Sequence, residues 1–339
     1  MRRFLSWTIR ILLGLVVAGG GALLLWTAGQ NREIDAQESF APADNAPGRI
    51  VEVRGRNLHV LTLGKPFGDP TGAPLVLLHG FSAAGHATWL PWANRLAAKR
   101  TVILIDMLNF GHSERITQAH PDLSHQGQAG LVNALLDELG VNQIDLVGWS
   151  MGGAIAAQYT LDYPQRVRAL TFVAAHVYGG DRFNPFQMLG ELPLGVGRAL
   201  TWNSMGGSPN GRSAQTCATT GQQCNWKNLL LITDTVDGLR AISATEQISR
   251  LPADLEQIDK PTLVVAGATD TIVPRADSEN LAGTLDAKLF VAEGAGHWPG
   301  EANPAQIAQL ILDFFAVNAQ QLRGNPNRVN PRHQLTGEY

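Results

Sequence analysis

The chain has 339 residues, of which 45% are hydrophobic and 16% charged, and its 26 basic and 29 acidic residues give a net charge of -3 at pH 7. This composition excludes a disordered chain and a coiled coil, and without a basic excess it gives no sign of a nucleic-acid partner. The two cysteines are too few for a zinc cluster or a disulfide-built scaffold. The length fits two average domains, or one large α/β domain with an insertion.

The first feature in chain order is an apolar segment. No residue from Ile11 to Ala28 is charged, and a helix of about 18 residues is about 27 Å long, close to the thickness of the hydrocarbon core of a bilayer. Arginines precede this run, which places the N-terminus in the cytoplasm by the positive-inside rule. We therefore expect residues 1–28 to form a single-pass signal anchor in the membrane, with the rest of the chain in the periplasm or outside the cell. A cleaved secretory signal peptide is the alternative.

Residues 29–48 are polar and contain Pro42 and Pro47, so we interpret them as a linker. After them, short apolar runs alternate with helical patterns, and continuous apolar strands are typical of a parallel sheet that is covered on both faces. The alternation therefore predicts an α/β fold with a mainly parallel sheet. The strand runs are 50–53, 58–63, 75–78, 102–105, 144–147, 170–173, 262–265 and 288–291, and the helical patterns are 89–98, 123–139, 154–163, 275–281 and 304–315.

One connection is too long to be a simple crossover. Roughly 85 residues separate the sixth strand run from the seventh, and connections in compact domains are much shorter. We therefore predict an inserted subdomain over residues 177–260. The core is then formed by residues 49–176 and 261–317, and residues 318–339 are predicted to be a loose tail.

The inserted subdomain contains both cysteines, Cys217 and Cys224, which are seven positions apart. In an exported domain these two thiols would close a short disulfide loop, because an oxidising compartment preserves such bonds. Two free thiols are the alternative. A comparison of reduced and non-reduced peptide masses distinguishes the two states.

A strand-turn-helix pattern marks a candidate nucleophile. The chain reads Gly-Trp-Ser-Met-Gly-Gly from Gly148, directly after the fifth strand run and before a helical pattern. A sharp turn there lifts the hydroxyl of Ser150 clear of the sheet, and backbone crowding requires the glycines Gly148 and Gly152. The N–H of Met151 and the positive end of the helix dipole then face the place where an oxyanion would form. We interpret Ser150 as a nucleophile, with an inert serine in a glycine turn as the alternative.

A serine nucleophile needs a base, and the base needs a carboxylate that orients it. His297 follows the last predicted strand and Asp270 follows the strand before it. Sheet enzymes place catalytic groups in loops at the carboxyl ends of strands. We therefore predict that Ser150, His297 and Asp270 are the catalytic residues. A surface-loop histidine and a helix-capping aspartate are the alternatives, and Asp277 is a weaker candidate for the acid.

Two further segments follow predicted strands. The run His79-Gly80-Phe81 comes directly after the third strand, and the backbone N–H of Phe81 is the predicted second oxyanion donor. We assign His79 itself a structural role. Asp106 and His112 lie in the segment after the fourth strand, and because no partner for either is evident in the sequence, we favour a structural role for them as well.

Together these motifs resemble the α/β-hydrolase superfamily over about residues 49–317. The resemblance implies a sheet of eight strands with a cap after strand six, and a covalent acyl-enzyme mechanism that needs no metal and no organic cofactor. The serine nucleophile is similar to that of esterases, lipases and carbon–carbon bond hydrolases, and unlike the aspartate of haloalkane dehalogenases and epoxide hydrolases. The motifs are LLHGF from Leu77, DMLNFGHS from Asp106, GWSMGG from Gly148, GATDTIVP from Gly267 and GAGHWP from Gly294, in the order serine, aspartate, histidine.

We therefore expect a serine hydrolase that cleaves carboxylic esters of small molecules. Ser150 would attack the ester carbonyl, His297 would pass the proton to the leaving alcohol, and Asp270 would hold the imidazole. Apolar residues of the cap suit an apolar, lipid-like acyl group, and the cap's own core is the alternative explanation for them. Two other classes stay open, namely a hydrolase of carbon–carbon bonds in vinylogous diketones and a catalytically silent binding protein.

Overall fold

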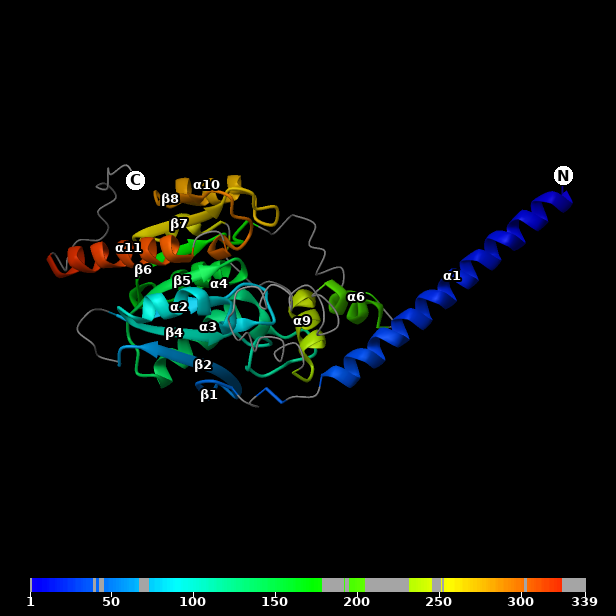
Figure 1. The fold of residues 1–339 in the computed structure, drawn as a ribbon, viewed down its shortest axis with the longest axis horizontal. Coiled ribbons are helices and arrows are strands. Elements are labelled where there is room, and N and C mark those ends of the chain that lie inside the picture. Colours follow the sequence, from blue (N-terminus) through cyan, green and yellow to red (C-terminus); the bar gives the residue numbers. More distant parts are fainter. Residues whose placement is uncertain are drawn as a thin grey trace.

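The structure is organised around one eight-stranded sheet (Figure 1). It is a computed structural model that describes residues 2–38, 41–42, 46–66, 73–178, 192, 195–204, 232–245, 251, 253–301 and 304–324. The strands are β1 (Arg49–Val53), β2 (Arg56–Gly64), β3 (Leu75–Leu78), β4 (Thr101–Asp106), β5 (Ile144–Trp149), β6 (Val167–Val173), β7 (Thr262–Gly267) and β8 (Lys288–Ala292).

The strand order confirms the predicted fold class. Neighbouring strands follow the order β1-β2-β4-β3-β5-β6-β7-β8. Strand β2 is antiparallel to its neighbours β1 and β4, whereas all the other neighbouring pairs are parallel. The chain therefore has the eight-stranded, mostly parallel sheet that the motifs implied.

Helices cover both faces of this sheet because successive strand residues point to opposite sides. Leu75 and Leu77 of β3 belong to an apolar cluster with α2 (Leu90–Ala97) and α11 (Pro304–Gly324) on one face. Val76 and Leu78 belong to the cluster on the other face, which includes residues of α3 (His125–Glu138), α4 (Met151–Asp162) and α10 (Arg275–Thr284). Every residue of β3 is buried, which explains why its sequence is apolar without alternation.

The chain leaves the sheet after β6 and returns as β7, as the long connection in the sequence predicts. Between these strands lie the described helices α6 (Val196–Ser204) and α9 (Thr235–Ala244), which contact each other. The side chain of Asn109, in the loop after β4, donates a hydrogen bond of 2.7 Å to the carbonyl of Gly238. Helix α9 is thereby attached to the core on the side where the strands end.

Helix α1 (Arg2–Gln37) differs from the expected anchor and linker. It is one helix that continues through residues 29–37, and its N-terminal part extends away from the rest of the chain (Figure 1). Its C-terminal part contacts α6. Ile34 is fully buried in a small apolar cluster with Trp202 and Val236. Residues 29–37 of the predicted linker are thus helical, and one face of this part of the helix packs against α6 and α9.

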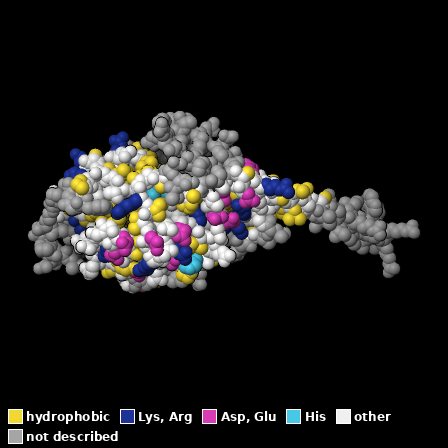
Figure 2. Space-filling model, turned by 90° about the horizontal axis from the view of Figure 1, so that it is seen from below, with side chains coloured by type: hydrophobic (Ala, Val, Ile, Leu, Met, Phe, Trp, Pro, Cys, Tyr) yellow, Lys and Arg dark blue, Asp and Glu magenta, His cyan; other side chains and the backbone are white. Residues whose placement is uncertain are grey.

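Polar contacts strengthen this junction. Arg198 of α6 forms ion pairs with Asp35 of α1 at 2.7 Å and with Asp237 of α9 at 3.0 Å. Figure 2 shows acidic and basic side chains close together where α1 meets the body of the molecule. Glu38, directly after α1, accepts hydrogen bonds from the backbone N–H groups of Asp234 and Val236 at the start of α9.

The predicted membrane-anchored location is wrong. Within the described part of the chain, no helix combines the length and the apolar character that crossing a membrane requires. Helix α1 also continues beyond the apolar run through the charged residues Arg32, Glu33 and Asp35.

Two smaller expectations concern the predicted tail and the predicted disulfide. Helix α11 continues to Gly324, into the predicted tail, and Asn318 is buried with its side chain donating to the carbonyl of Phe314 at 2.7 Å. The predicted disulfide between Cys217 and Cys224 lies outside the described residues.

Candidate active site

Ser150 lies in a sharp turn between β5 and α4. Its φ of 52° is in the left-handed region, where a non-glycine residue is strained. Its backbone N–H donates to the Val173 carbonyl at 3.0 Å, and its carbonyl accepts from His176 N–H at 3.0 Å, so β6 and the segment after it hold the turn. A Cβ at Gly148 would overlap the carbonyl oxygen of Gly152, and a Cβ at Gly152 would overlap that of Leu78, which explains why both positions are glycine.

The structure brings together the three predicted catalytic side chains. The Nε2 atom of His297 lies 2.9 Å from the Ser150 hydroxyl oxygen, and its Nδ1 atom lies 2.9 Å from Oδ2 of Asp270. The Asp270 side chain is 1% exposed and that of His297 17%. An Nδ1–H donated to Asp270 leaves the Nε2 lone pair facing the hydroxyl, which is the arrangement a general base requires. Asp277, the weaker candidate, is buried in α10.

Backbone contacts support the carboxylate of Asp270. Its Oδ1 atom accepts hydrogen bonds from the N–H groups of Ile272 at 2.8 Å and Val273 at 2.9 Å. Burial acts to raise the pKa of Asp270, but the hydrogen bond with His297 and these two N–H donors hold the pKa below its usual value. Asp270 is thus ionised at neutral pH and stabilises positive charge on His297.

The loops that carry Asp270 and His297 are joined to each other. Thr269 donates from both its N–H and its hydroxyl to the carbonyl of Ala295, each at 2.9 Å. The N–H of Ala268 also donates to the Ala292 carbonyl at 3.1 Å. These bonds extend the pairing of β7 and β8 beyond the strand ends, so the acid and the base are held at a fixed separation.

A group of tryptophans supports the His297 loop. The indole N–H of Trp149, the residue before the nucleophile, donates to the carbonyl of His297 at 2.9 Å. Its ring also packs against Trp298, with ring centroids 4.6 Å apart. Trp298 in turn stacks on Trp92 and meets Trp89 edge-on. The sequence motifs do not assign this role to Trp149, and its position next to Ser150 is the only signal for it in the sequence.

The two predicted oxyanion donors lie beside the nucleophile. Met151 is the first residue of α4, and the first N–H groups of a helix have no acceptor within it. A Cβ at Gly80, the neighbour of Phe81, would lie 3.1 Å from the Cβ of Ser150. The backbone of this segment therefore passes directly against the nucleophile, and the ring of Phe81 packs edge-on against Phe110.

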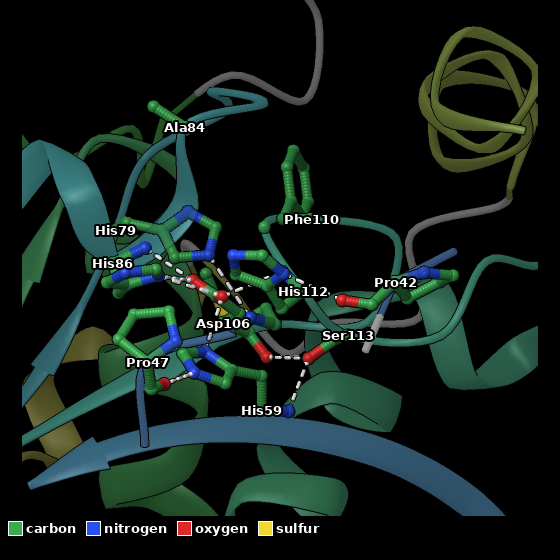
Figure 3. Close-up of polar contacts among 12 residues, drawn as sticks. Pro42, Pro47, His59, His79, Ala84, His86, Asp106, Phe110, His112 and Ser113 are labelled. Carbon is green, nitrogen blue, oxygen red and sulfur yellow. Dashed lines mark hydrogen bonds and ion pairs between the residues drawn. The ribbon is translucent and has the colours of Figure 1, made fainter. Parts of the chain in front are cut away.

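Asp106 forms a second cluster with histidines behind this segment (Figure 3). Its Oδ2 atom lies 2.7 Å from Nδ1 of His59 and 2.9 Å from Nδ1 of His86, and it accepts the backbone N–H of His112 at 2.8 Å. Oδ1 accepts the backbone N–H of His86. Burial acts to raise the pKa of Asp106, but the neighbouring His86 and His59 hold the pKa well below its usual value. The structural roles favoured for Asp106 and His112 agree with these contacts.

The spacing within this cluster is that of hydrogen bonds. The ligand atoms of His59, His86 and Asp106 lie within 4.8 Å of one another. A tetrahedral zinc ion with ligands at about 2.0–2.1 Å separates its ligand atoms by about 3.3 Å, whereas the two imidazole nitrogens lie 2.7 and 2.9 Å from the same carboxylate oxygen. We therefore interpret the group as a hydrogen-bonded cluster and not as a metal centre.

Comparison with protein families and curated proteins agrees with this geometry. Residues 73–203 match the model of the family described as alpha/beta hydrolase fold. A 2-hydroxy-6-oxononadienedioate/2-hydroxy-6-oxononatrienedioate hydrolase of Paraburkholderia phymatum is 30% identical over 73% of this chain and 89% of its own length. A 2-hydroxymuconate semialdehyde hydrolase of Pseudomonas sp. strain CF600 is 30% identical over 80% of this chain and 97% of its own length.

Solved structures show the same fold. A meta-cleavage product hydrolase from Pseudomonas fluorescens IP01 superimposes with a TM-score of 0.61 at 21% identity, and the match covers 80% of this chain and 98% of that one. At this identity the similarity concerns the fold alone. The two sequence relatives, which match over most of their own length, extend the similarity beyond the fold.

Proposed function

Because the chain belongs to the alpha/beta hydrolase fold family, we propose that it is a serine hydrolase that cleaves a carbon–carbon bond next to the carbonyl group of a conjugated small molecule. The observation that carries this proposal is the 30% identity to two curated hydrolases over 89% and 97% of their lengths. The names of their substrates describe oxo or semialdehyde acids without an ester or an amide. Water can therefore cleave such molecules only at a carbon–carbon bond.

This proposal reverses the order of the two hydrolase classes in the sequence analysis. Ester cleavage stood first there, because the Ser150, His297 and Asp270 motifs alone suit an ester. The relatives favour the carbon–carbon alternative. The triad geometry serves both reactions, since each begins with nucleophilic attack on a carbonyl carbon.

The first half of the reaction forms an acyl-enzyme. Ser150 Oγ attacks the carbonyl carbon while His297 Nε2 takes its proton, and Asp270 stabilises the resulting imidazolium. The N–H groups of Phe81 and Met151 donate to the oxyanion. When the tetrahedral intermediate collapses, the carbon–carbon bond breaks and its electron pair moves to the departing carbon. Before this cleavage the enol tautomerises to its ketone, with a proton moved from the hydroxyl group to the carbon next to the attacked carbonyl. Conjugation with that ketone in the departing fragment then stabilises the pair, and the proton on His297 neutralises it.

The second half releases the acid. Water attacks the acyl-enzyme while His297 accepts one of its protons, and the same proton returns to Ser150 Oγ when the ester bond to the enzyme breaks. The Ser150 hydroxyl is restored, and the net reaction consumes one water molecule. The balance uses only groups of the chain, the substrate and this water molecule.

A substrate pair tests the proposal. Full-length protein is assayed with 2-hydroxymuconate semialdehyde and a 2-hydroxy-6-oxo dienoate, followed by loss of their conjugated absorbance, and with p-nitrophenyl butyrate. We expect kcat/KM for one of the dienoates to exceed that for the ester by at least about tenfold. Ser150→Ala is the control and is expected to be inactive on every substrate. Rapid ester turnover without cleavage of either dienoate would overturn the proposal and restore the ester reading.

A further inference from the structure

His59 of β2 lies between two hydrogen-bond acceptors in the interior (Figure 3). Its Nδ1 atom is 2.7 Å from Oδ2 of Asp106, and its Nε2 atom contacts the backbone carbonyl oxygen of Pro47. The side chains of His59 and Asp106 are both 0% exposed. Water is therefore excluded from the contact between these two side chains.

These contacts determine the protonation of the His59 ring. A neutral imidazole has one N–H donor and one acceptor nitrogen, but neither the carboxylate nor the carbonyl can donate. A neutral ring would place a lone pair against an oxygen lone pair at one of its two contacts. Only the imidazolium, with a proton on each nitrogen, makes both hydrogen bonds. The buried pair is then a cation and an anion in direct contact, which limits the cost of burying either charge.

His79, in the same region, shows the opposite case. Its Nδ1 atom faces the carbonyl of Gly80 at 2.7 Å, whereas its Nε2 atom accepts the backbone N–H of Met107 at 3.1 Å. One acceptor and one donor suit a neutral ring, and burial lowers the pKa of His79. The two histidines are both fully buried, so their partners and not their burial decide the charge.

Asp106 connects this ion pair to the segment of the predicted oxyanion donor. It binds both the backbone N–H and the ring of His86. Its carboxylate also fills the space beside Gly85 and Gly111, where a Cβ would overlap it. The N–H of Gly111 in turn donates to the carbonyl of Ala83 at 3.3 Å. Residues 79–86, which include Phe81, are thus attached at both ends to the segment that begins at Asp106.

We propose that His59 is a positioning residue for the reaction, held as a buried imidazolium that keeps Asp106 ionised and oriented, so that Asp106 holds the segment carrying the Phe81 N–H against Ser150. This inference rests on the proposed role of Phe81 as an oxyanion donor and not on the identity of the substrate. It predicts that loss of the His59 proton slows the chemical step.

The surroundings of His59 favour its charged form. The groups that face its ring are Asp106 of β4, His86 after the Phe81 segment, His112 with its ring centroid 5.2 Å away, and the Pro47 carbonyl. Burial acts to lower the pKa of His59, but the hydrogen bond and the charge of Asp106 raise the pKa above its ordinary value. The proton is therefore lost at a higher pH than from an ordinary imidazole.

Nuclear magnetic resonance tests the charge directly. In full-length protein with nitrogen-15-labelled histidine, the His59 ring is assigned by its proton contacts to Pro47, which needs no variant. We expect both ring nitrogens of His59 to carry protons at pH 7, whereas His79 carries one. A single proton on His59 at pH 7 would overturn the proposal.

The rate at which an organophosphonate labels Ser150 tests the positioning role without any choice of substrate. We expect His59→Gln to reduce the maximal labelling rate about tenfold. Complete removal of an oxyanion donor lowers a rate by more than this, whereas the variant only displaces the Phe81 N–H. We also expect it to remove the alkaline decline of the pH profile. His112→Gln is the matched control, since its ring binds the Pro42 carbonyl and not Asp106; it should label at the wild-type rate.

The outcomes separate the two proposals. If wild-type protein is not labelled, the proposed serine chemistry fails. If it is labelled and His59→Gln retains its rate and its alkaline decline, the serine chemistry stands and the positioning role is overturned. If His59→Gln does not fold, the resonance measurement on wild-type protein still decides the charge of His59. The pH profile of wild-type labelling then decides the positioning role. A profile without an alkaline decline overturns that role.

Discussion

Two histidine–aspartate pairs lie on either side of the predicted oxyanion segment, and they differ in what the second ring nitrogen meets. In the pair of His297 and Asp270, Nε2 faces the Ser150 hydroxyl, which both donates and accepts. In the pair of His59 and Asp106, Nε2 faces the Pro47 carbonyl, which only accepts. The first ring can lose and regain a proton during a reaction, whereas the second keeps both of its protons. A histidine–aspartate contact is therefore no sign of a catalytic base unless its outer neighbour can exchange a proton.

The largest effect should come from breaking the catalytic pair. We expect Asp270→Asn to lower kcat by about 10⁴-fold, because the imidazole loses both its orienting acceptor and the charge that stabilises its protonated form. Steady-state kinetics on the substrate identified for the wild type measures the loss. The thermal midpoint serves as the control. If the variant retains kcat within tenfold, Asp270 is not the orienting carboxylate.

Breaking the buried pair should instead destabilise the fold. We expect Asp106→Asn to lower the free energy of unfolding by about 3–5 kcal/mol, because it leaves the His59 imidazolium buried without its counter-charge. Urea denaturation followed by circular dichroism gives this value. The same measurement on Asp270→Asn should show a smaller change. Equal destabilisation by the two variants would contradict the contrast between the pairs.

A smaller effect should come from loosening the support of the catalytic histidine. Trp149→Phe keeps an aromatic ring but removes the hydrogen bond to the His297 carbonyl, and we expect kcat to fall about fivefold, as for the loss of about 1 kcal/mol. Trp92→Phe is the matched control, because the indole nitrogen of Trp92 is buried without a hydrogen-bond partner in the described part of the chain. If both variants behave alike, packing and not the hydrogen bond supports the loop.

The smallest effects should appear in the pH dependence of stability, where the two pairs have effects of opposite sign. The lowered pKa of Asp270 means that its contribution is present above about pH 4 and is lost as the pH falls through the folded-state value. The raised pKa of His59 means that its contribution is present below about pH 6.5 and is lost as the pH rises through the folded-state value. Unfolding measured across the pH range should lose its acid slope in Asp270→Asn and its alkaline slope in His59→Gln. Unchanged slopes would contradict the assignment.

Much of the geometry of the proposed catalytic pair could be predicted because each residue follows a strand. Asp270 and His297 lie in loops after the neighbouring strands β7 and β8. Ser150 lies in the turn between β5 and α4. Parallel strands bring such loops to one edge of the sheet, so chain order alone indicates proximity. The sheet itself was predictable for a similar reason, since buried parallel strands are apolar throughout.

The buried pair could not be predicted in the same way. His59 lies in the interior of β2, 47 positions before Asp106, and it meets that residue only because β2 pairs antiparallel with β4 in a register that places the two residues opposite each other. Nothing in the local pattern of β2 indicates that register. The position of α1 depended equally on a distant contact, because the partners of Ile34 are Trp202 and Val236 in the cap.

The tryptophans near His297 give the protein an internal optical reporter. Trp89, Trp92, Trp149 and Trp298 have neighbouring ring centroids 4.6 to 5.4 Å apart, close enough for their electronic transitions to couple. Fixed aromatic packing of this kind produces a near-ultraviolet circular dichroism band. Since the indole of Trp149 holds the His297 carbonyl, detachment of the catalytic loop should alter this band while the helical far-ultraviolet signal persists.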